Sequence, residues 1–124
     1  MKHPIVTPAA PGAIGPYSQA IDAGAFVYTS GQLPIDPATN EMPDGIREQT
    51  AQSLENVKAI LTAAGLGMEN VVKTLVFLAD MAEFGPMNEV YSLYFTEPFP
   101  ARSAVAVKDL PKGARVEIEV IAVR

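Results

Sequence analysis

One arginine near the end of the chain has a setting suited to binding a carboxylate. Arg102 follows a segment stiffened by Pro98 and Pro100 and begins a predicted strand. A guanidinium fixed in this way presents a planar fork of N–H groups that matches the two oxygens of a carboxylate. The alternative is an arginine that only forms an ion pair at the surface, which is common for this residue type.

Glu117 is the second residue that could take part in chemistry. In the run Val116–Val120, Glu117 and Glu119 point to one side of a predicted strand and the aliphatic residues point to the other. Ile121 and Val123 then join the glutamate side, so we expect part of this side to be buried in an assembly. A carboxylate near such an interface could orient or activate water, with a raised pKa if it is desolvated. The alternative is a solvated strand face.

Three further residues are weaker candidates. Tyr17 carries a phenol on a loop rich in proline and glycine, and the alternative is an aromatic ring that packs over the sheet. Ser30 and Gly31 end a predicted strand and could offer a hydroxyl and a backbone N–H that a ligand approaches closely. A plain turn is the alternative for this pair.

Residue counts exclude several kinds of site. The sequence has no cysteine, which removes thiolate nucleophiles, thiolate metal ligands and disulfide bonds. His3 is the only histidine, so neither a serine-type triad nor a metal cluster is expected. The segment Gly12–Gly15 lacks the Lys-Ser/Thr pair and the following helix of a phosphate-binding loop. We therefore expect no metal.

The net charge and the hydropathy pattern limit the partners. The formal charge of -5 repels phosphate backbones, so nucleic acid is not an expected partner. The first residues lack the apolar core of a signal peptide, and no apolar run is long enough to span a bilayer. We expect a cytoplasmic protein with no membrane partner.

Composition and patterning predict one α+β domain over residues 1–124. Hydrophobic residues make up 48% of the sequence and charged residues 19%, a balance that supports a packed core. The clearest helix runs from Ile46 to Ala64, where apolar residues recur at helical spacing. Asp44 is its predicted N-cap, and Gly65 suits its exit.

The remaining elements are strands and one further helix. The predicted strands are Ser18–Asp22, Ala25–Thr29, Asn70–Ala79, Ser103–Lys108 and Arg115–Val123. The second helix has Pro86 in its first turn and an apolar stripe that reaches Phe95. This order predicts a mixed sheet of five or six strands with both helices on one face.

Two helices cannot cover both faces of such a sheet. The strands at Asn70–Ala79 and Arg115–Val123 nevertheless place apolar side chains on each side. An apolar sheet face left in water invites aggregation, so we expect a closed homo-oligomer that covers it.

Five short segments form a pattern that extends over nearly the whole chain. They are Gly15–Ala20, Ser30–Gln32, Asn88–Tyr91, Pro100–Ser103 and Val116–Glu119. Together they resemble the RidA family, also called the YjgF/YER057c/UK114 family. The most specific part is an arginine after Pro-Ala and a glutamate in a later Ile/Val-rich strand, here Arg102 and Glu117.

The resemblance implies both an architecture and an activity. The implied fold is a chorismate-mutase-like α+β domain assembled as a homotrimer, with the sheets around a central barrel and the sites in clefts between subunits. The implied reaction is hydrolysis of reactive 2-imino or enamine acids, such as 2-iminobutanoate and 2-iminopropanoate, to 2-keto acids and ammonia. The expected ligand is therefore a small 2-imino or 2-keto acid. Because a protonated imine is already electrophilic, no cofactor is expected.

The resemblance also implies roles for individual residues. Arg102 would bind the substrate carboxylate, and Glu117 would position the water that attacks the imine carbon. The residues that it places along the cleft are Tyr17, Ser30, Gly31, Asn88 and Ala104. Many relatives carry cysteine where this chain has Ala104, so thiol-dependent regulation is not expected here, although a backbone group of Ala104 could still face the cleft.

Two other functions stay open on the sequence alone. A non-catalytic small-carboxylate-binding trimer, acting as a sensor or in a chaperone-like way, would use the same cleft without needing Glu117. An endoribonuclease, an activity reported for some relatives, is disfavoured by the acidic charge and the lack of a histidine pair.

Overall fold

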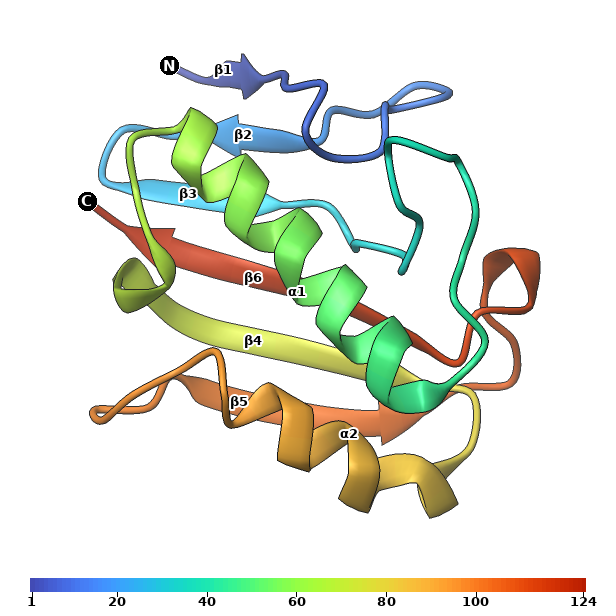
Figure 1. Ribbon diagram of the computed structural model, residues 1–124. Coiled ribbons are helices and arrows are strands. Elements are labelled where there is room, and N and C mark those ends of the chain that lie inside the picture. The colour runs from blue at the N-terminus through green and yellow to red at the C-terminus, as the bar shows by residue number, and fades with distance from the viewer.

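The alternating apolar residues of the chain form one mixed sheet (Figure 1). The computed structural model describes all 124 residues. Its strands are β1 (His3–Ile5), β2 (Ala20–Asp22), β3 (Phe26–Thr29), β4 (Val71–Leu78), β5 (Ala101–Ala106) and β6 (Val116–Val123). They lie in the order β1-β2-β3-β6-β4-β5. All neighbours are antiparallel except β4 and β5, whose parallel pairing requires a crossover connection.

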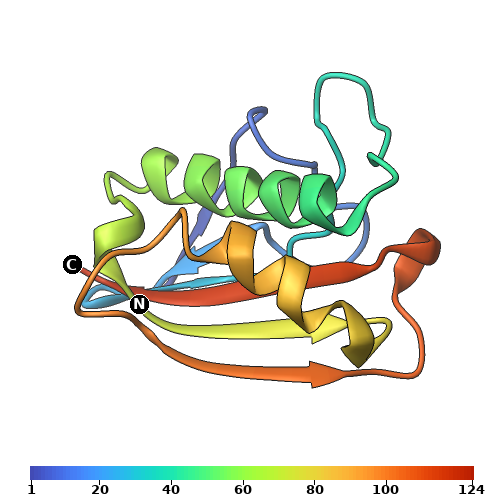
Figure 2. The ribbon, with the colours of Figure 1, turned by 60° about the horizontal axis from the view of Figure 1, so that its bottom comes forward.

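Two helices cover one face of the sheet, as the sequence predicted (Figure 2). The helix α1 (Ile46–Ala63) packs over the middle of the sheet, and α2 (Phe84–Tyr91) lies in the crossover from β4 to β5. The buried face of α1 includes Leu54, Val57 and Leu61, which belong to the predicted stripe. Gly65 follows α1 with a positive φ of 77°, which explains why glycine suits this exit. No helix has the length and apolar composition needed to cross a bilayer.

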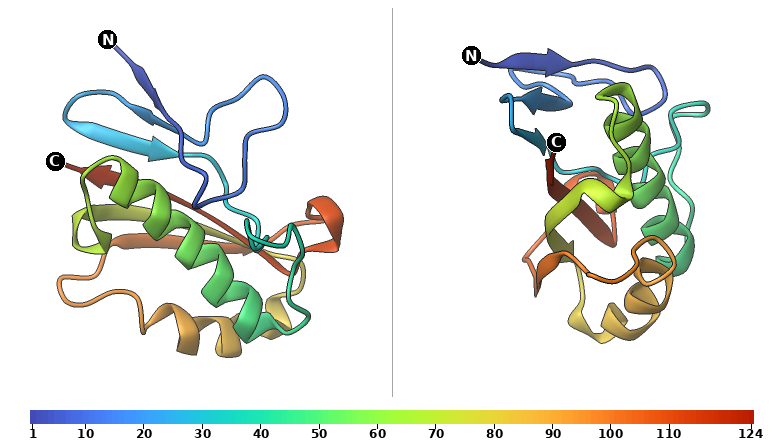
Figure 3. Two further views of the ribbon diagram at one scale, coloured as in Figure 1. Left: turned by 45° about the horizontal axis from the view of Figure 1, so that its top comes forward. Right: turned by 90° about the vertical axis from the view of Figure 1, so that its left-hand side faces the viewer.

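The opposite face of the sheet carries no helix (Figure 3). Along β4 the side chains on the helix side, Val76 and Leu78 among them, are fully buried. On the open side Phe26, Tyr28 and Val105 keep 40%, 44% and 46% of their surface exposed. A single chain therefore leaves aromatic and aliphatic groups in water on this face, which is the condition that the predicted oligomer would relieve.

Three details of the predicted elements are wrong. The short strand β1 was not predicted, because a strand of three residues that contains Pro4 has no alternation to detect. The helix α2 ends at Tyr91, so Tyr94 and Phe95 lie beyond it, although Phe95 is still buried against the core. Asp44 does not cap α1: Gly45 occupies the N-cap, and no side chain makes a capping hydrogen bond there.

Candidate functional site

Arg102 lies on the edge strand β5 with its side chain on the helix-covered face, and it is the second residue of the strand rather than the first. Its neighbour across the parallel pair is the buried Thr74 of β4. One terminal nitrogen of the guanidinium, Nη1, donates a hydrogen bond of 2.6 Å to Oδ1 of Asn88 on α2. The guanidinium carbon also lies 4.6 Å from the centre of the Tyr91 ring and 5.3 Å from that of Phe84.

No carboxylate pairs with Arg102. The ion pairs of the molecule belong to three other arginines, Arg47, Arg115 and Arg124. A cleft of about 410 Å³ opens beside the guanidinium and is lined by Asn88, Tyr91, Ser92, Phe99, Pro100 and Arg102. The surface ion pair considered from the sequence is therefore absent, and the positive charge faces a cleft with no anion of the protein to neutralise it.

Glu117 lies on the other face of the sheet, in contact with Gly31. An isolated antiparallel bridge between Gln32 and Ile118 brings the segment after β3 beside β6. The Glu117 carboxyl occupies the space next to the Gly31 α-carbon: a Cβ there would overlap its Oε2 and lie 2.8 Å from its Cδ. Glycine at this position lets the Glu117 carboxyl lie against the backbone, and no unusual backbone angle is involved.

The carboxyl of Glu117 has a perturbed environment. Its partial burial raises its pKa, and the nearby negative charge of Glu119 raises the pKa further. Both effects disfavour the ionised form. The predicted side of this residue is confirmed, since Glu117 and Glu119 alternate with the buried Val116, Ile118 and Val120 along β6.

Tyr17 lines the same cleft as Gly31, and Ser30 precedes Gly31 in the chain. A cleft of about 480 Å³ has Tyr17, Gly31 and Lys112 on its walls, and Tyr17 keeps 53% of its surface exposed. Ser30 donates its hydroxyl to the Ser18 carbonyl at 2.6 Å, which ties the strand end to the loop before β2. Tyr17 is thus a cleft residue rather than an aromatic group packed over the sheet.

The buried amide of Gln19 anchors the loop that carries Tyr17. Its nitrogen donates to the carbonyls of Thr7, Ala10 and Pro11 at 2.8 to 3.2 Å, and its oxygen accepts from the Thr7 N–H at 2.8 Å. One side chain therefore satisfies four backbone groups of a loop that has little secondary structure of its own.

Within one chain, Arg102 and Glu117 cannot act on the same molecule. Arg102 is paired with Thr74 and Glu117 with Phe77, and residues three positions apart on β4 point to opposite faces. We name the two groups the arginine half (Phe84, Asn88, Tyr91 and Arg102) and the glutamate half (Tyr17, Ser30, Gly31 and Glu117). Ala104 belongs to the side of the arginine half, where it packs against the core beside Val76.

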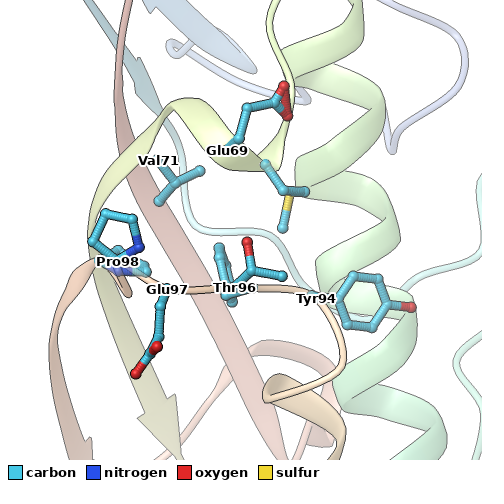
Figure 4. A pocket seen from close by; sticks show the side chains of 9 residues that line it. Glu69, Val71, Tyr94, Thr96, Glu97 and Pro98 are labelled. Carbon is cyan, nitrogen blue, oxygen red and sulfur yellow. The ribbon is translucent and has the colours of Figure 1, made fainter.

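A third cavity contains none of the predicted site residues (Figure 4). It measures about 270 Å³ and lies between the start of β4 and the segment after α2. Its two acidic residues, Glu69 and Glu97, point away from one another in Figure 4. Nowhere does the molecule group three or more histidine, cysteine, aspartate or glutamate side chains in a way that could hold a metal ion.

Comparisons with known proteins identify the family. The family described as endoribonuclease L-PSP has a sequence model that matches residues 7–124. The chain belongs to this family. It is the family that the five sequence segments resembled, so that prediction is confirmed.

Curated relatives match over their full length. A RutC family protein of Pyrococcus horikoshii is 56% identical over 123 residues, covering 98% of both chains. A protein of Salmonella typhimurium named 2-iminobutanoate/2-iminopropanoate deaminase is 51% identical over 127 residues, covering 100% of this chain and 99% of that one. Among solved structures, Escherichia coli TdcF with bound serine is 50% identical, covers 98% of both chains and gives a TM-score of 0.95.

Sequence reasoning missed two residues of the arginine half. Phe84 and Tyr91 contact the guanidinium, yet the first was not considered, and the second entered only in the apolar stripe and in the segment Asn88–Tyr91, without a role in the site. The available signal was spacing: Phe84, Asn88 and Tyr91 stand at i, i+4 and i+7, which is one face of a helix. The polar Asn88 in the middle of that face marks it as different from a purely apolar stripe.

Proposed function

We propose that this protein hydrolyses small 2-imino acids, such as 2-iminobutanoate and 2-iminopropanoate, to the 2-keto acid and ammonia. The observation that carries the proposal is a guanidinium with no protein anion beside it, facing an open cleft. Relatives at about half identity over the full chain are named for this activity, which is the activity expected from the sequence.

The chemistry requires little from the protein. A protonated imine is already electrophilic, so water adds to the imine carbon, the C–N bond breaks, and ammonia leaves as the carbonyl forms. We assign the substrate carboxylate to Arg102 and the placement of the water to Glu117, with no metal or cofactor needed. Holding both reactants in one geometry lowers the entropic part of the barrier.

We further propose that each site forms between two copies of the chain. Arg102 and Glu117 point to opposite faces of the sheet, so a site that contains both needs the arginine half of one copy and the glutamate half of another. A closed ring of three copies would supply three such sites and would cover the open sheet face with its exposed Phe26 and Tyr28. Tyr17, Ser30, Gly31, Asn88 and the backbone of Ala104 would then border the shared cleft.

The proposal is tested by the decay of 2-iminopropanoate generated by an amino-acid oxidase. The protein should accelerate decay in proportion to its concentration, and Arg102→Ala should abolish the acceleration. Equal decay with wild type and variant would contradict the assignment. Light scattering should give the mass of an oligomer, and a stable monomer at micromolar concentration would refute the shared site.

Mixing two inactive variants tests the shared site directly. Arg102→Ala and Glu117→Gln are each expected to be inactive alone. After the two are unfolded together and refolded in equal amounts, about a quarter of the sites should combine two intact halves, since each half is drawn at random. No recovery of activity in a mixed, correctly assembled oligomer would show that both residues do not serve one site.

A family described by endoribonuclease activity also requires a test of RNA cleavage. The formal charge of -5 and the single histidine, His3, make this function less favourable than imine hydrolysis. Highly purified protein should leave RNA intact. Cleavage that is abolished by Arg102→Ala would support ribonuclease activity in the same site.

A further inference from the structure

Three neutral side chains from one face of α2 contact the guanidinium of Arg102. Phe84, Asn88 and Tyr91 stand at i, i+4 and i+7, so their side chains meet on one side of the helix. Asn88 accepts one guanidinium N–H at 2.6 Å, and the two rings lie 5.3 and 4.6 Å from the guanidinium carbon. These distances fall within the range in which a cation is attracted to an aromatic face.

A contact with strand β4 of the sheet holds the ring of Tyr91 in place. Its hydroxyl shares a 2.8 Å hydrogen bond with the hydroxyl of Thr74, which is fully buried and is the register partner of Arg102. The ring also packs against Phe95, with 4.7 Å between ring centres. Burial raises the pKa of the Tyr91 phenol, so the group against the guanidinium stays uncharged at neutral pH.

The two acidic residues that adjoin Phe84 and Asn88 in sequence are engaged elsewhere. Glu83 precedes Phe84 and pairs with Arg115 at 2.6 Å. Glu89 follows Asn88, but it pairs with Arg47 of α1 at 2.9 Å. The other residues that line the cleft beside Arg102 are Ser92, Phe99 and Pro100, none of which carries a charge. A guanidinium has five N–H donors, and Asn88 uses one of them.

We propose that Phe84, Asn88 and Tyr91 form a neutral cradle that orients Arg102 without a countercharge, so that the carboxylate of the ligand is its ion-pair partner. This assignment extends the proposed function and rests on it, because the proposed function supplies the identity of the ligand. The three residues are positioning residues, because each acts through Arg102. An amide and two rings hold the fork in place, whereas a carboxylate in the position of Asn88 would hold it and also neutralise it.

The first test replaces the amide of the cradle with an acid. Asn88→Asp retains the size of the side chain and adds one negative charge, and Ala63→Glu adds the same charge at an exposed position near the end of α1. Calorimetric titration with 2-ketobutyrate should show about tenfold weaker binding, or worse, for Asn88→Asp, because the new carboxylate competes for the guanidinium. The Ala63→Glu control should bind like wild type. Equal affinity in Asn88→Asp and the control would overturn the proposal.

The second test removes a ring. Tyr91→Leu should raise KM for the imine about fivefold or more with a smaller change in kcat, because a loosened clamp weakens substrate and transition state alike. Tyr91→Phe, which keeps the ring, should recover most of that loss. A lower apparent kcat at unchanged KM in Tyr91→Leu would indicate only a smaller folded fraction and would contradict the cradle.

A spectroscopic test separates the cradle from the catalytic proposal. In wild type the terminal guanidinium nitrogens of Arg102 should give separate, slowly exchanging NMR signals, identified by their absence in Arg102→Ala, and these should merge in Tyr91→Leu. Separate signals together with no acceleration of imine decay would reject the hydrolase and keep the cradle. Merged signals in wild type would reject the cradle whatever the activity.

Discussion

The arginine half and the glutamate half are built in different ways. Arg102 lies on a regular strand under a helix, and its contacts come from α2 at helical spacing and from the adjacent β4. Glu117 lies on a regular strand too, but its contact is Gly31 in the segment after β3, and Tyr17 comes from a loop held by Gln19. One half depends on packing between regular elements, and the other on loop conformation.

The two halves also differ in how their surroundings affect the charge of the central residue. Neutral groups surround Arg102, which keeps its charge available. Burial and the charge of Glu119 act against ionisation of Glu117. A permanent cation suits recognition, whereas a carboxyl with a raised pKa suits the placement of a water and the transfer of a proton. The difference suggests a division between binding and turnover that substitutions can separate.

Removal of the guanidinium should have the largest effect. Arg102→Ala should lower kcat/KM by about 2 to 5 kcal/mol of transition-state binding, because a charged two-point contact is lost. Steady-state kinetics on the imine would measure the loss. Arg124→Ala is the matched control, since Arg124 is exposed and its ion-pair partner is Asp22, which is not part of the arginine half. A comparable loss in both variants would mean that the effect is not specific to the arginine half.

A change in the glutamate half should separate turnover from binding. Glu117→Gln should lower kcat about 100-fold, since an amide cannot take a proton from water. Calorimetry should show that 2-ketobutyrate still binds. If kcat is unchanged, Glu117 has no catalytic part and another group must place the water.

A methyl group at Gly31 should have a smaller effect. In Gly31→Ala the new Cβ overlaps the Glu117 carboxyl, which must move, and kcat should fall about tenfold. Gly85→Ala is the control, because nothing lies within 4 Å of a Cβ at that position. A crystal structure of Gly31→Ala with Glu117 unmoved would contradict the expected mechanism.

The pH dependence should show the smallest change. Since the raised pKa of Glu117 keeps the carboxyl protonated above its ordinary value of 4.5, activity should rise with pH through the raised pKa. Glu119→Gln removes a neighbouring charge, so the acidic limb of the kcat profile should move to lower pH. No movement of that limb would show that another group controls it.

The raised pKa of Glu117 also makes the stability of the fold depend on pH. A raised carboxyl pKa means that the folded chain binds more protons than the unfolded chain between the ordinary and the raised pKa. The free energy of unfolding should therefore fall as the pH rises through that window, and Glu117→Gln should remove this contribution. Chemical denaturation at several pH values would measure the difference.

Much of the fold was predictable because burial follows periodicity. The positions of α1, β4 and β6 came from apolar spacing that the structure confirms. The same rule misplaced the end of α2, since Phe95 stays buried after the helix has ended. Spacing indicates which residues are buried, and a chain can bury a residue without remaining helical.

The candidate site was less predictable. The alternation along the strand predicted which face of the sheet carries Glu117. Its contact with Gly31, however, depends on a bridge between Gln32 and Ile118, which are far apart in sequence. The neutral surroundings of Arg102 likewise depend on the parallel register of β4 and β5. Residue roles came from the resemblance to a family, and spacing within the chain could not have supplied them.

The placement of Arg102 and Glu117 on opposite faces has a consequence for how activity begins. On the proposed arrangement, a newly made chain carries every catalytic group and is still dormant, because no substrate can touch both groups until another copy docks. Specific activity should then drop on dilution below the dissociation constant of the assembly and return on concentration. Quaternary assembly would act as the switch that turns the enzyme on, without a ligand or a covalent modification.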